Sequence, residues 1–179
     1  MDSLDSKKVI FLDRDGVINE EVNYLRRINE FRFIDGVFDA CLQFLDCGYQ
    51  IIIITNQSGI SKGYLNERKF MQITKWMTDQ FRKKNIKILD IFYCPHNPED
   101  NCACRKPNPG MFLQAKKKHN IDMAHSWAIG DKETDIVAAN NSGISKTILV
   151  KSGHKFDYKN HCAVFCLNSL REASKIICN

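Results

Sequence analysis

The chain is predicted to fold as a doubly wound α/β protein, a Rossmann-like parallel sheet with helices on both faces. Apolar runs typical of buried parallel strands alternate with amphipathic helical segments along the sequence. Polar and acidic residues follow several of those runs directly, and ligands of such sheets bind beyond the carboxyl ends of the strands. We expect a single domain, residues 1–179, because this length supports one sizeable core but not two.

Each element is predicted from its own local pattern. The run 50–55 is apolar on both faces, as expected of a central parallel strand. The segment 35–48 has its apolar residues on one helical stripe and ends in glycine. Asn66 can cap the next helix, and Asn108, followed by Pro109, the one after that. The predicted strands are 9–13, 50–55, 88–93, 126–130, 146–150 and 163–167, and the predicted helices are 35–48, 66–84, 108–119, 134–142 and 169–177.

The composition is that of an ordinary globular protein. The chain is 44% hydrophobic with a formal charge of +5, and no apolar run reaches the ~18 residues of a membrane span. Its basic runs at 82–84 and 116–118 fall late in predicted helices, where cations interact favourably with the helix dipole. The N-terminal residues 1–8 lack the apolar core of a secretory signal, so we expect a cytoplasmic protein.

Two carboxylates, Asp13 and Asp15, follow the first predicted strand and indicate an enzyme. Alternate strand residues point to the same side, so the two acids face one point, where their repulsion requires a cation or a shared proton. A carboxylate can attack a phosphoryl group, and a neighbouring carboxyl can protonate the leaving oxygen. Asp13 is therefore the predicted nucleophile, and Asp15 the predicted general acid and base.

Two further positions are predicted to stabilise the phosphoryl group. Thr55 ends the second strand, and its hydroxyl can hold phosphate oxygens together with the amides of the following loop. Lys106 offers a fixed positive charge for the same group. Its neighbour Arg105 can bind a second anionic group through the planar guanidinium.

A second acidic cluster follows the strand at 126–130 and predicts a metal site. Asp131 would bind Mg²⁺ together with Asp13 and the main-chain carbonyl of Asp15. This sparse ligand set suits Mg²⁺, which keeps several of its waters. Asp135, one helical turn later, is expected to orient Lys106 or a metal-bound water.

A cysteine-rich loop predicts a second metal. Cys94, His96, Cys102 and Cys104 have the spacing C-x-H-x5-C-x-C. Three thiolates and one imidazole form the closed tetrahedral set of a structural Zn²⁺. We expect this Zn²⁺ to stiffen the loop that leads to Lys106.

These motifs resemble those of the haloacid-dehalogenase (HAD) superfamily. Asp13-Arg-Asp15-Gly16, Thr55, Lys106 and Gly130-Asp131 with Asp135 match its four phosphatase motifs in order. From residue 9 to residue 175 the chain looks like the heptose-bisphosphate phosphatases. The zinc loop and Arg105-Lys106-Pro107 are also found in the related histidinol-phosphate phosphatases. The segments that carry the closer resemblance are FLDRDG at 11–16, FIDGV at 33–37, TNQSGI at 55–60, YCPH at 93–96, CRKP at 104–107, PGM at 109–111 and GDK at 130–132.

The resemblance implies a HAD fold without a large cap, in which Zn²⁺ stabilises the cysteine-rich loop. It also implies removal of the 7-phosphate of D-glycero-D-manno-heptose 1,7-bisphosphate, through an aspartyl-phosphate, on the way to nucleotide-activated heptose for surface polysaccharide. Arg105 and Lys132 would then contact the sugar or the distal phosphate. The implied substrate contacts are Glu21, Val22, Asn23, Tyr24, Asn56, Gln57, Ser58, Arg105 and Lys132.

Three other functions would also suit some of these sequence features. A histidinol-phosphate phosphatase would use the same chemistry on a different substrate. The positive charge would suit a phosphatase acting on nucleic-acid 3′-phosphates, and a non-enzymatic zinc-stabilised binding module would leave the acidic cluster structural. The preferred prediction is a Mg²⁺-dependent, zinc-containing monomer that binds a phosphorylated sugar, and neither nucleic acid nor membrane.

Overall fold

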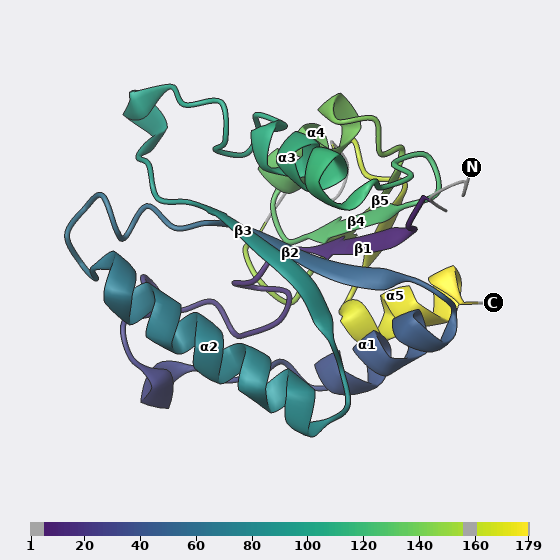
Figure 1. Ribbon diagram of the computed structural model, residues 1–179, viewed down its shortest axis with the longest axis horizontal. Coiled ribbons are helices and arrows are strands. Elements are labelled where there is room, and N and C mark those ends of the chain that lie inside the picture. The colour runs from purple at the N-terminus through teal and green to yellow at the C-terminus, as the bar shows by residue number, and fades with distance from the viewer. Residues whose placement is uncertain (1–5, 156–160, 179) are drawn as a thin grey trace.

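A computed structural model of the protein describes residues 6–155 and 161–178, and confirms the predicted α/β fold. The first residues of the N-terminal segment discussed above, 1–5, lie outside the described part. In the described residues, six parallel strands form one sheet in the order β3-β2-β1-β4-β5-β6, of which Figure 1 labels β1 to β5. The strands are β1 (Val9–Leu12), β2 (Gln50–Asn56), β3 (Ile88–Cys94), β4 (Trp127–Gly130), β5 (Lys146–Val150) and β6 (Phe165–Leu167).

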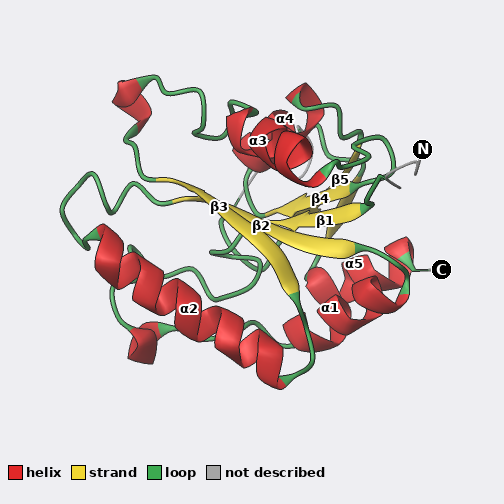
Figure 2. Ribbon diagram, viewed as in Figure 1, coloured by secondary structure: helices red, strands yellow, loops and turns green. Residues whose placement is uncertain are grey.

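The helices divide between the two faces of the sheet, as Figure 2 shows. On one side lie α1, α2 and α5, and on the other lie α3 and α4 (Figure 1). Among the described residues no insertion forms a large cap over the strand ends. The helices are α1 (Val37–Asp46), α2 (Glu67–Lys83), α3 (Gly110–His119), α4 (Glu133–Asn141) and α5 (Leu170–Ile177), with short 3-10 turns at Ile28–Glu30 and Pro98–Asp100.

Alternating side chains of the central strands fill both cores. In β1, Ile10 and Leu12 pack with α1, α2 and α5, whereas Val9 and Phe11 face α3 and α4. All four side chains are buried, which is why the strand is apolar at every position. The ring of Phe11 packs on that of Phe112 at 5.1 Å between centroids and so anchors α3 to the sheet.

Most element boundaries differ from the prediction by one or two residues, and two of these differences have a clear cause. Helix α3 begins at Gly110, with Pro109 at the cap and no side-chain cap hydrogen bond, so Asn108 does not serve as the N-cap. Asn108 instead donates to the carbonyl of Cys102 at 2.8 Å, because the preceding cysteine loop folds back on it. The last strand, β6, has three residues, since pairing with β5 begins only at Phe165. The predicted cap of α2 is present, with Asn66 accepting from the main-chain nitrogen of Lys69.

The carboxyl ends of the strands bring distant polar residues together. Asp13 follows β1, Asn56 ends β2 and Asp131 follows β4. Because all strands run the same way, these residues meet at one edge of the sheet. In the described part of the chain, no helix is both long and apolar enough to cross a membrane.

Candidate active site

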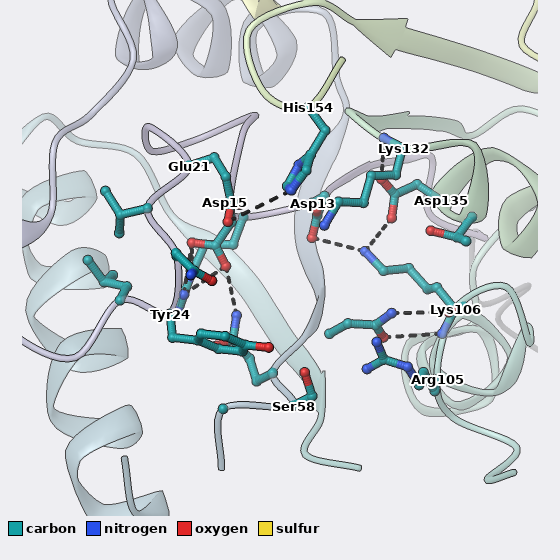
Figure 3. A pocket seen from close by; sticks show the side chains of 18 of the residues that line it. Asp13, Asp15, Glu21, Tyr24, Ser58, Arg105, Lys106, Lys132, Asp135 and His154 are labelled. Carbon is teal, nitrogen blue, oxygen red and sulfur yellow. Dashed lines mark hydrogen bonds and ion pairs between the residues drawn. The ribbon is translucent and has the colours of Figure 1, made fainter. Parts of the chain in front are cut away.

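The strand ends border a pocket into which charged side chains project from several loops (Figure 3). Asp13 and Asp15 lie at its floor, close to the end of β1. Lys106 reaches the same floor from the loop between β3 and α3. The predicted nucleophile, acid and cation therefore share one cavity, although more than 90 residues separate the first from the last.

Lys106 is buried between two carboxylates. Its Nζ lies 2.9 Å from Oδ1 of Asp13 and 2.7 Å from Oδ1 of Asp135, and it donates to the carbonyl of Ile54 at 2.7 Å. Burial alone would lower the pKa of Lys106, but the two carboxylates outweigh it and raise that pKa. Burial raises the pKa of Asp13 to about 6, although Lys106 acts in the opposite direction. Lys106 is thus a permanent cation beside the predicted nucleophile, Asp13.

The main chain of Lys106 is held at two points by Asn56. The side-chain nitrogen of Asn56 donates to the carbonyl of Lys106, and its side-chain oxygen accepts from the nitrogen of Lys106, both at 3.1 Å. The family resemblance implies that Asn56 contacts the substrate. In the structure Asn56 lines the pocket, but its amide is hydrogen-bonded to the main chain of Lys106. It therefore fixes the position from which the Lys106 side chain reaches Asp13.

Asp15 is held by three side chains. Arg14 donates to both of its oxygens at 2.8–2.9 Å, and Asn19 and Gln57 each donate at 2.9 Å. Burial pushes the pKa of Asp15 upward, but the charge of Arg14 and these hydrogen bonds together bring it below its ordinary value. Asp15 is therefore a fixed carboxylate in the free protein. The amide of Gln57 also donates to the buried hydroxyl of Thr55 at 2.9 Å and so links two of the predicted residues.

Three carboxylates form a candidate metal centre. One oxygen each from Asp13, Asp131 and Asp135 lies within 4.8 Å of the others. Asp135 is occupied, because Oδ1 pairs with Lys106 and Oδ2 accepts from the main-chain nitrogens of Asp131 and Lys132. Oδ1 of Asp131 is buried and, among the described residues, has no hydrogen-bond partner. A buried carboxylate oxygen without a donor suits a hard cation, so Asp13 and Asp131 fit Mg²⁺.

Two glycines press against the same carboxylate. A Cβ atom built on Gly16 would lie 2.3 Å from Oδ2 of Asp131, and one built on Gly153 would lie 2.1 Å from it. Neither position has room for a side chain. Gly16 also has a φ of +83°, a conformation that favours glycine. The orientation of Asp131 is thus fixed by close backbone packing from both sides.

The cysteine loop brings four potential metal ligands together. Sγ of Cys104 lies 3.2 Å from that of Cys94, 3.4 Å from that of Cys102 and 3.3 Å from Nδ1 of His96. Four donors in mutual contact form a compact cluster of the size that one tetrahedral ion needs. Arg105 donates to the carbonyl of His96 at 3.1 Å, so the cluster is tied directly to the pocket wall.

All nine predicted substrate residues line the pocket, together with several residues that were not predicted to contact the substrate. Tyr24 has a φ of +61°, and its hydroxyl accepts from Lys62 at 2.6 Å. His154 enters the pocket from the loop after β5, at a strand end like the other functional residues, and that position was the available signal. The predicted lining residues are Glu21, Val22, Asn23, Tyr24, Asn56, Gln57, Ser58, Arg105 and Lys132, and the unassigned ones include Arg14, Lys62, Pro98 and His154.

Comparisons with known proteins identify the family. A family model described as HAD-hydrolase-like matches residues 103–173. The D-glycero-alpha-D-manno-heptose-1,7-bisphosphate 7-phosphatase of Photorhabdus laumondii is 45% identical over 95% of this chain and 96% of its own. This chain belongs to the heptose-bisphosphate phosphatase family of the HAD superfamily. The D-glycero-beta-D-manno-heptose-1,7-bisphosphate 7-phosphatase of Yersinia pestis is 40% identical, with 96% of each chain covered.

A solved structure agrees with the heptose-bisphosphate phosphatase family. The crystal structure of D,D-heptose 1,7-bisphosphate phosphatase from B. bronchiseptica, complexed with magnesium and phosphate, is similar to this chain with a TM-score of 0.84. The two chains are 27% identical, and the match covers 95% of this chain and 97% of the other. This heptose-bisphosphate phosphatase homologue is thus an enzyme of the HAD phosphatase class, and its carboxylate cluster is of the kind that holds Mg²⁺.

We expect the substitution Gly16→Ala to weaken Mg²⁺ binding about 10- to 100-fold, the loss typical when the support of a ligand is disturbed. The new Cβ would displace Oδ2 of Asp131. Gly48→Ala is the matched control, since Gly48 has a φ of +80° and nothing within 4 Å of a built Cβ. Calorimetric Mg²⁺ titration of both variants checks this. Wild-type affinity in Gly16→Ala would show that the new Cβ leaves Asp131 in place.

Proposed function

We propose that this enzyme removes the 7-phosphate of D-glycero-D-manno-heptose 1,7-bisphosphate, with Asp13 as nucleophile and Asp15 as general acid and base. The observation that carries the proposal is the buried Lys106 ammonium in contact with Asp13, in the same pocket as an oriented Asp15. The names of relatives at 39–45% identity support the heptose substrate over histidinol phosphate. The product would enter the synthesis of nucleotide-activated heptose for surface polysaccharide.

In the first step Asp13 attacks phosphorus. Oδ1 contacts Lys106, and we assign the attack to Oδ2. A bond forms between Oδ2 and phosphorus while the bond from phosphorus to the sugar O7 breaks, and O7 takes a proton from Asp15. Lys106 and the hydroxyl of Thr55 would stabilise the negative charge that spreads over the equatorial oxygens.

In the second step a water molecule attacks the aspartyl-phosphate. Asp15 takes a proton from that water, the bond between Asp13 and phosphorus breaks, and inorganic phosphate leaves. Asp15 must hold a proton before the first step, whereas Arg14, Asn19 and Gln57 keep it ionised in the free protein. A dianionic phosphate beside Asp15 raises its pKa by like-charge repulsion, so we expect substrate binding to be accompanied by proton uptake.

Asp13 and Asp131 would hold the Mg²⁺, with the main-chain carbonyl of Asp15 as a third ligand. When bound, the ion neutralises phosphate charge and brings the anionic substrate up to the Asp13 carboxylate. The unpartnered Oδ1 of Asp131 supports this assignment. Asp135 would act through its contacts with Lys106 and the loop amides, and not as a ligand.

The pocket wall has cations suited to a second phosphate. Arg105 and Lys132 line the cavity (Figure 3). Lys62, from the loop before α2, also lines it. We assign Arg105 and Lys132 to the distal phosphate, and Glu21, Val22, Asn23, Tyr24 and Ser58 to the sugar. A bisphosphate would engage both ends of this pocket, whereas histidinol phosphate offers an ammonium in place of the second anion.

The test is Mg²⁺-dependent phosphate release from both anomers of the heptose bisphosphate, with histidinol phosphate alongside. We expect the larger kcat/KM with one heptose anomer. A larger kcat/KM for histidinol phosphate would remove the assigned substrate while keeping the chemistry. In Arg105→Ala, the penalty should be greater for the bisphosphate than for p-nitrophenyl phosphate, since only the former has a distal phosphate.

We further propose that Cys94, His96, Cys102 and Cys104 bind one structural Zn²⁺. The sulfur and nitrogen atoms already form a compact set with no position left open for a substrate. Because Lys106 follows this loop by two residues, the ion would keep the ammonium in register with Asp13.

Substituting Cys104→Ser should release the Zn²⁺ and lower kcat/KM about 100-fold, since an ångström of misplacement at a reacting group can cost that much. The sheet should stay folded, because Cys104 lies only at the margin of one of the two cores and serine is close to cysteine in size. Cys162→Ser, at an exposed cysteine outside the cluster, is the control. Metal analysis, circular dichroism and kinetics together make the measurement. Full activity in zinc-free Cys104→Ser would refute a positioning role for the ion.

A further inference from the structure

The loop after β5, residues 151–155, lies directly against the metal-binding carboxylate. Ser152 donates through its hydroxyl to the carbonyl of Gly16 at 2.7 Å, which ties this loop to the turn that follows Asp15. Next to it, Gly153 approaches Asp131 so closely that a Cβ would lie 2.1 Å from Oδ2. The loop is therefore part of the catalytic centre, although none of its residues has a role in the proposed mechanism.

His154, the next residue of this loop, binds Asp131 twice. Its main-chain nitrogen donates to Oδ2 at 2.8 Å, and Nδ1 of the ring lies 2.6 Å from the same oxygen. The other oxygen, Oδ1, is buried without a hydrogen-bond partner among the described residues. The two oxygens of one carboxylate thus have opposite environments, one doubly bound by His154 and one left for a cation.

The second ring nitrogen of His154 faces the pocket. Nε2 lies 3.9 Å from Oε1 of Glu21, across the cavity wall that Lys132 also lines (Figure 3). That separation is too long for a direct hydrogen bond. Both side chains are partly exposed, 37% for His154 and 29% for Glu21, so a substrate group can reach them. A hydroxyl both donates and accepts, and it can therefore contact an imidazole nitrogen and a carboxyl oxygen at once.

We propose that His154 is a positioning and specificity residue that serves the metal-binding carboxylate with one ring nitrogen and a substrate hydroxyl with the other. Through Nδ1 and its main-chain nitrogen it holds Oδ2 of Asp131, so that Oδ1 points at the cation. Through Nε2 it forms, with Glu21, a site for a hydroxyl of the sugar chain. The inference rests on the proposed function, in which Asp131 binds Mg²⁺ and the substrate is a polyhydroxylated phosphate ester.

Two amide substitutions separate the two contacts. The side-chain nitrogen of asparagine can replace Nδ1 of histidine, and that of glutamine can replace Nε2. His154→Asn should therefore keep the hold on Asp131 and lose the pocket contact, and His154→Gln should do the reverse. The matched control is His125→Ala, because His125 also meets an aspartate, Asp122, through both its main-chain nitrogen and Nδ1, but far from the pocket.

The first readout is calorimetric Mg²⁺ binding to the substrate-free protein. We expect the dissociation constant to rise about 10- to 100-fold in His154→Ala and His154→Gln, as is typical when a group that orients a metal ligand is lost. In His154→Asn and His125→Ala it should stay near that of the wild type. Wild-type affinity in His154→Ala would overturn the positioning role, and this result does not depend on which substrate the enzyme prefers.

The second readout is KM for the heptose bisphosphate at saturating Mg²⁺. We expect KM to rise several-fold in His154→Asn, to return toward the wild-type value in His154→Gln, and to stay constant for p-nitrophenyl phosphate in both. Equal KM values in the wild type and His154→Asn would overturn the hydroxyl contact. If the wild type itself fails to hydrolyse the heptose bisphosphates, the proposed function fails, while the Mg²⁺ titrations still decide the role of His154 at Asp131.

Discussion

Asp13→Asn should abolish phosphate release, with a loss of at least about 10⁴-fold in kcat, as expected when a nucleophile that forms a covalent intermediate is removed. The amide cannot form the aspartyl-phosphate. Its shape is nearly unchanged, so the contact with Lys106 and the fold should persist. Phosphate release and trapping of a phosphorylated protein make the measurement. A phosphorylated intermediate in Asp13→Asn would assign the nucleophile to another residue.

The same substitution should change how stability depends on pH. Burial raises the pKa of Asp13 from 3.8 to about 6, so the folded protein holds this proton more tightly than the unfolded chain. In Mg²⁺-free buffer the wild type should therefore lose stability as the pH rises from about 4 to 6. Asp13→Asn should lack that loss, whereas Asp35→Asn, at an exposed carboxylate, should retain it. If the curves of Tm against pH are parallel for the wild type and Asp13→Asn, the pKa of Asp13 is not raised in the folded protein.

Lys106→Met should damage both stability and catalysis. It leaves Asp13 and Asp135 buried without their cation, and breaking a buried ion pair in this way costs about 3–5 kcal/mol. It also removes a donor that stabilises the phosphoryl group, which costs about 10²- to 10³-fold in kcat. Because the unpaired carboxylates are the cause, the stability deficit should shrink at low pH, where they are protonated, and on adding Mg²⁺.

Lys118→Met is the matched control for this experiment. Lys118 pairs with Asp90 at the same 2.7 Å that joins Lys106 to Asp135, but its side chain is 61% exposed. Exposed pairs contribute about 1 kcal/mol or less, so this variant should stay close to the wild type. Thermal and chemical unfolding with and without Mg²⁺ give the comparison. A Lys106→Met protein as stable as Lys118→Met would mean that the buried carboxylates are neutral without their partner.

Much of the site could be predicted because it follows from the topology. Strand ends of a parallel sheet meet at one edge, and so the acidic residues after β1 and β4 had to converge. Lys106 lies on a loop, and its assignment depended on its place beside the cysteine cluster. The spacing of Cys94, His96, Cys102 and Cys104 likewise placed their side chains in one cluster in advance.

What could not be predicted is how each polar side chain is used. Asn56 and Gln57 lie at the strand end where a substrate contact was expected, yet their amides bind Lys106 and Asp15. A sequence pattern places a side chain at an edge but does not choose its hydrogen-bond partner. Arg14 and Asn19 orient Asp15, and His154 orients Asp131 from 23 residues away. Such pairings depend on loop conformations, which the hydrophobic periodicity of a sequence does not predict.

The two glycines that pack against Asp131 should affect which homologues keep a functional metal site. A relative can retain every carboxylate and the lysine and still carry a side chain at the position of Gly16 or Gly153, where no Cβ fits beside Asp131. Such a protein would keep its fold, since neither glycine belongs to the apolar core. We expect such a relative to bind Mg²⁺ about 10- to 100-fold more weakly. The residues at these two positions should therefore help to separate fully active relatives from impaired ones when the acidic motifs alone do not.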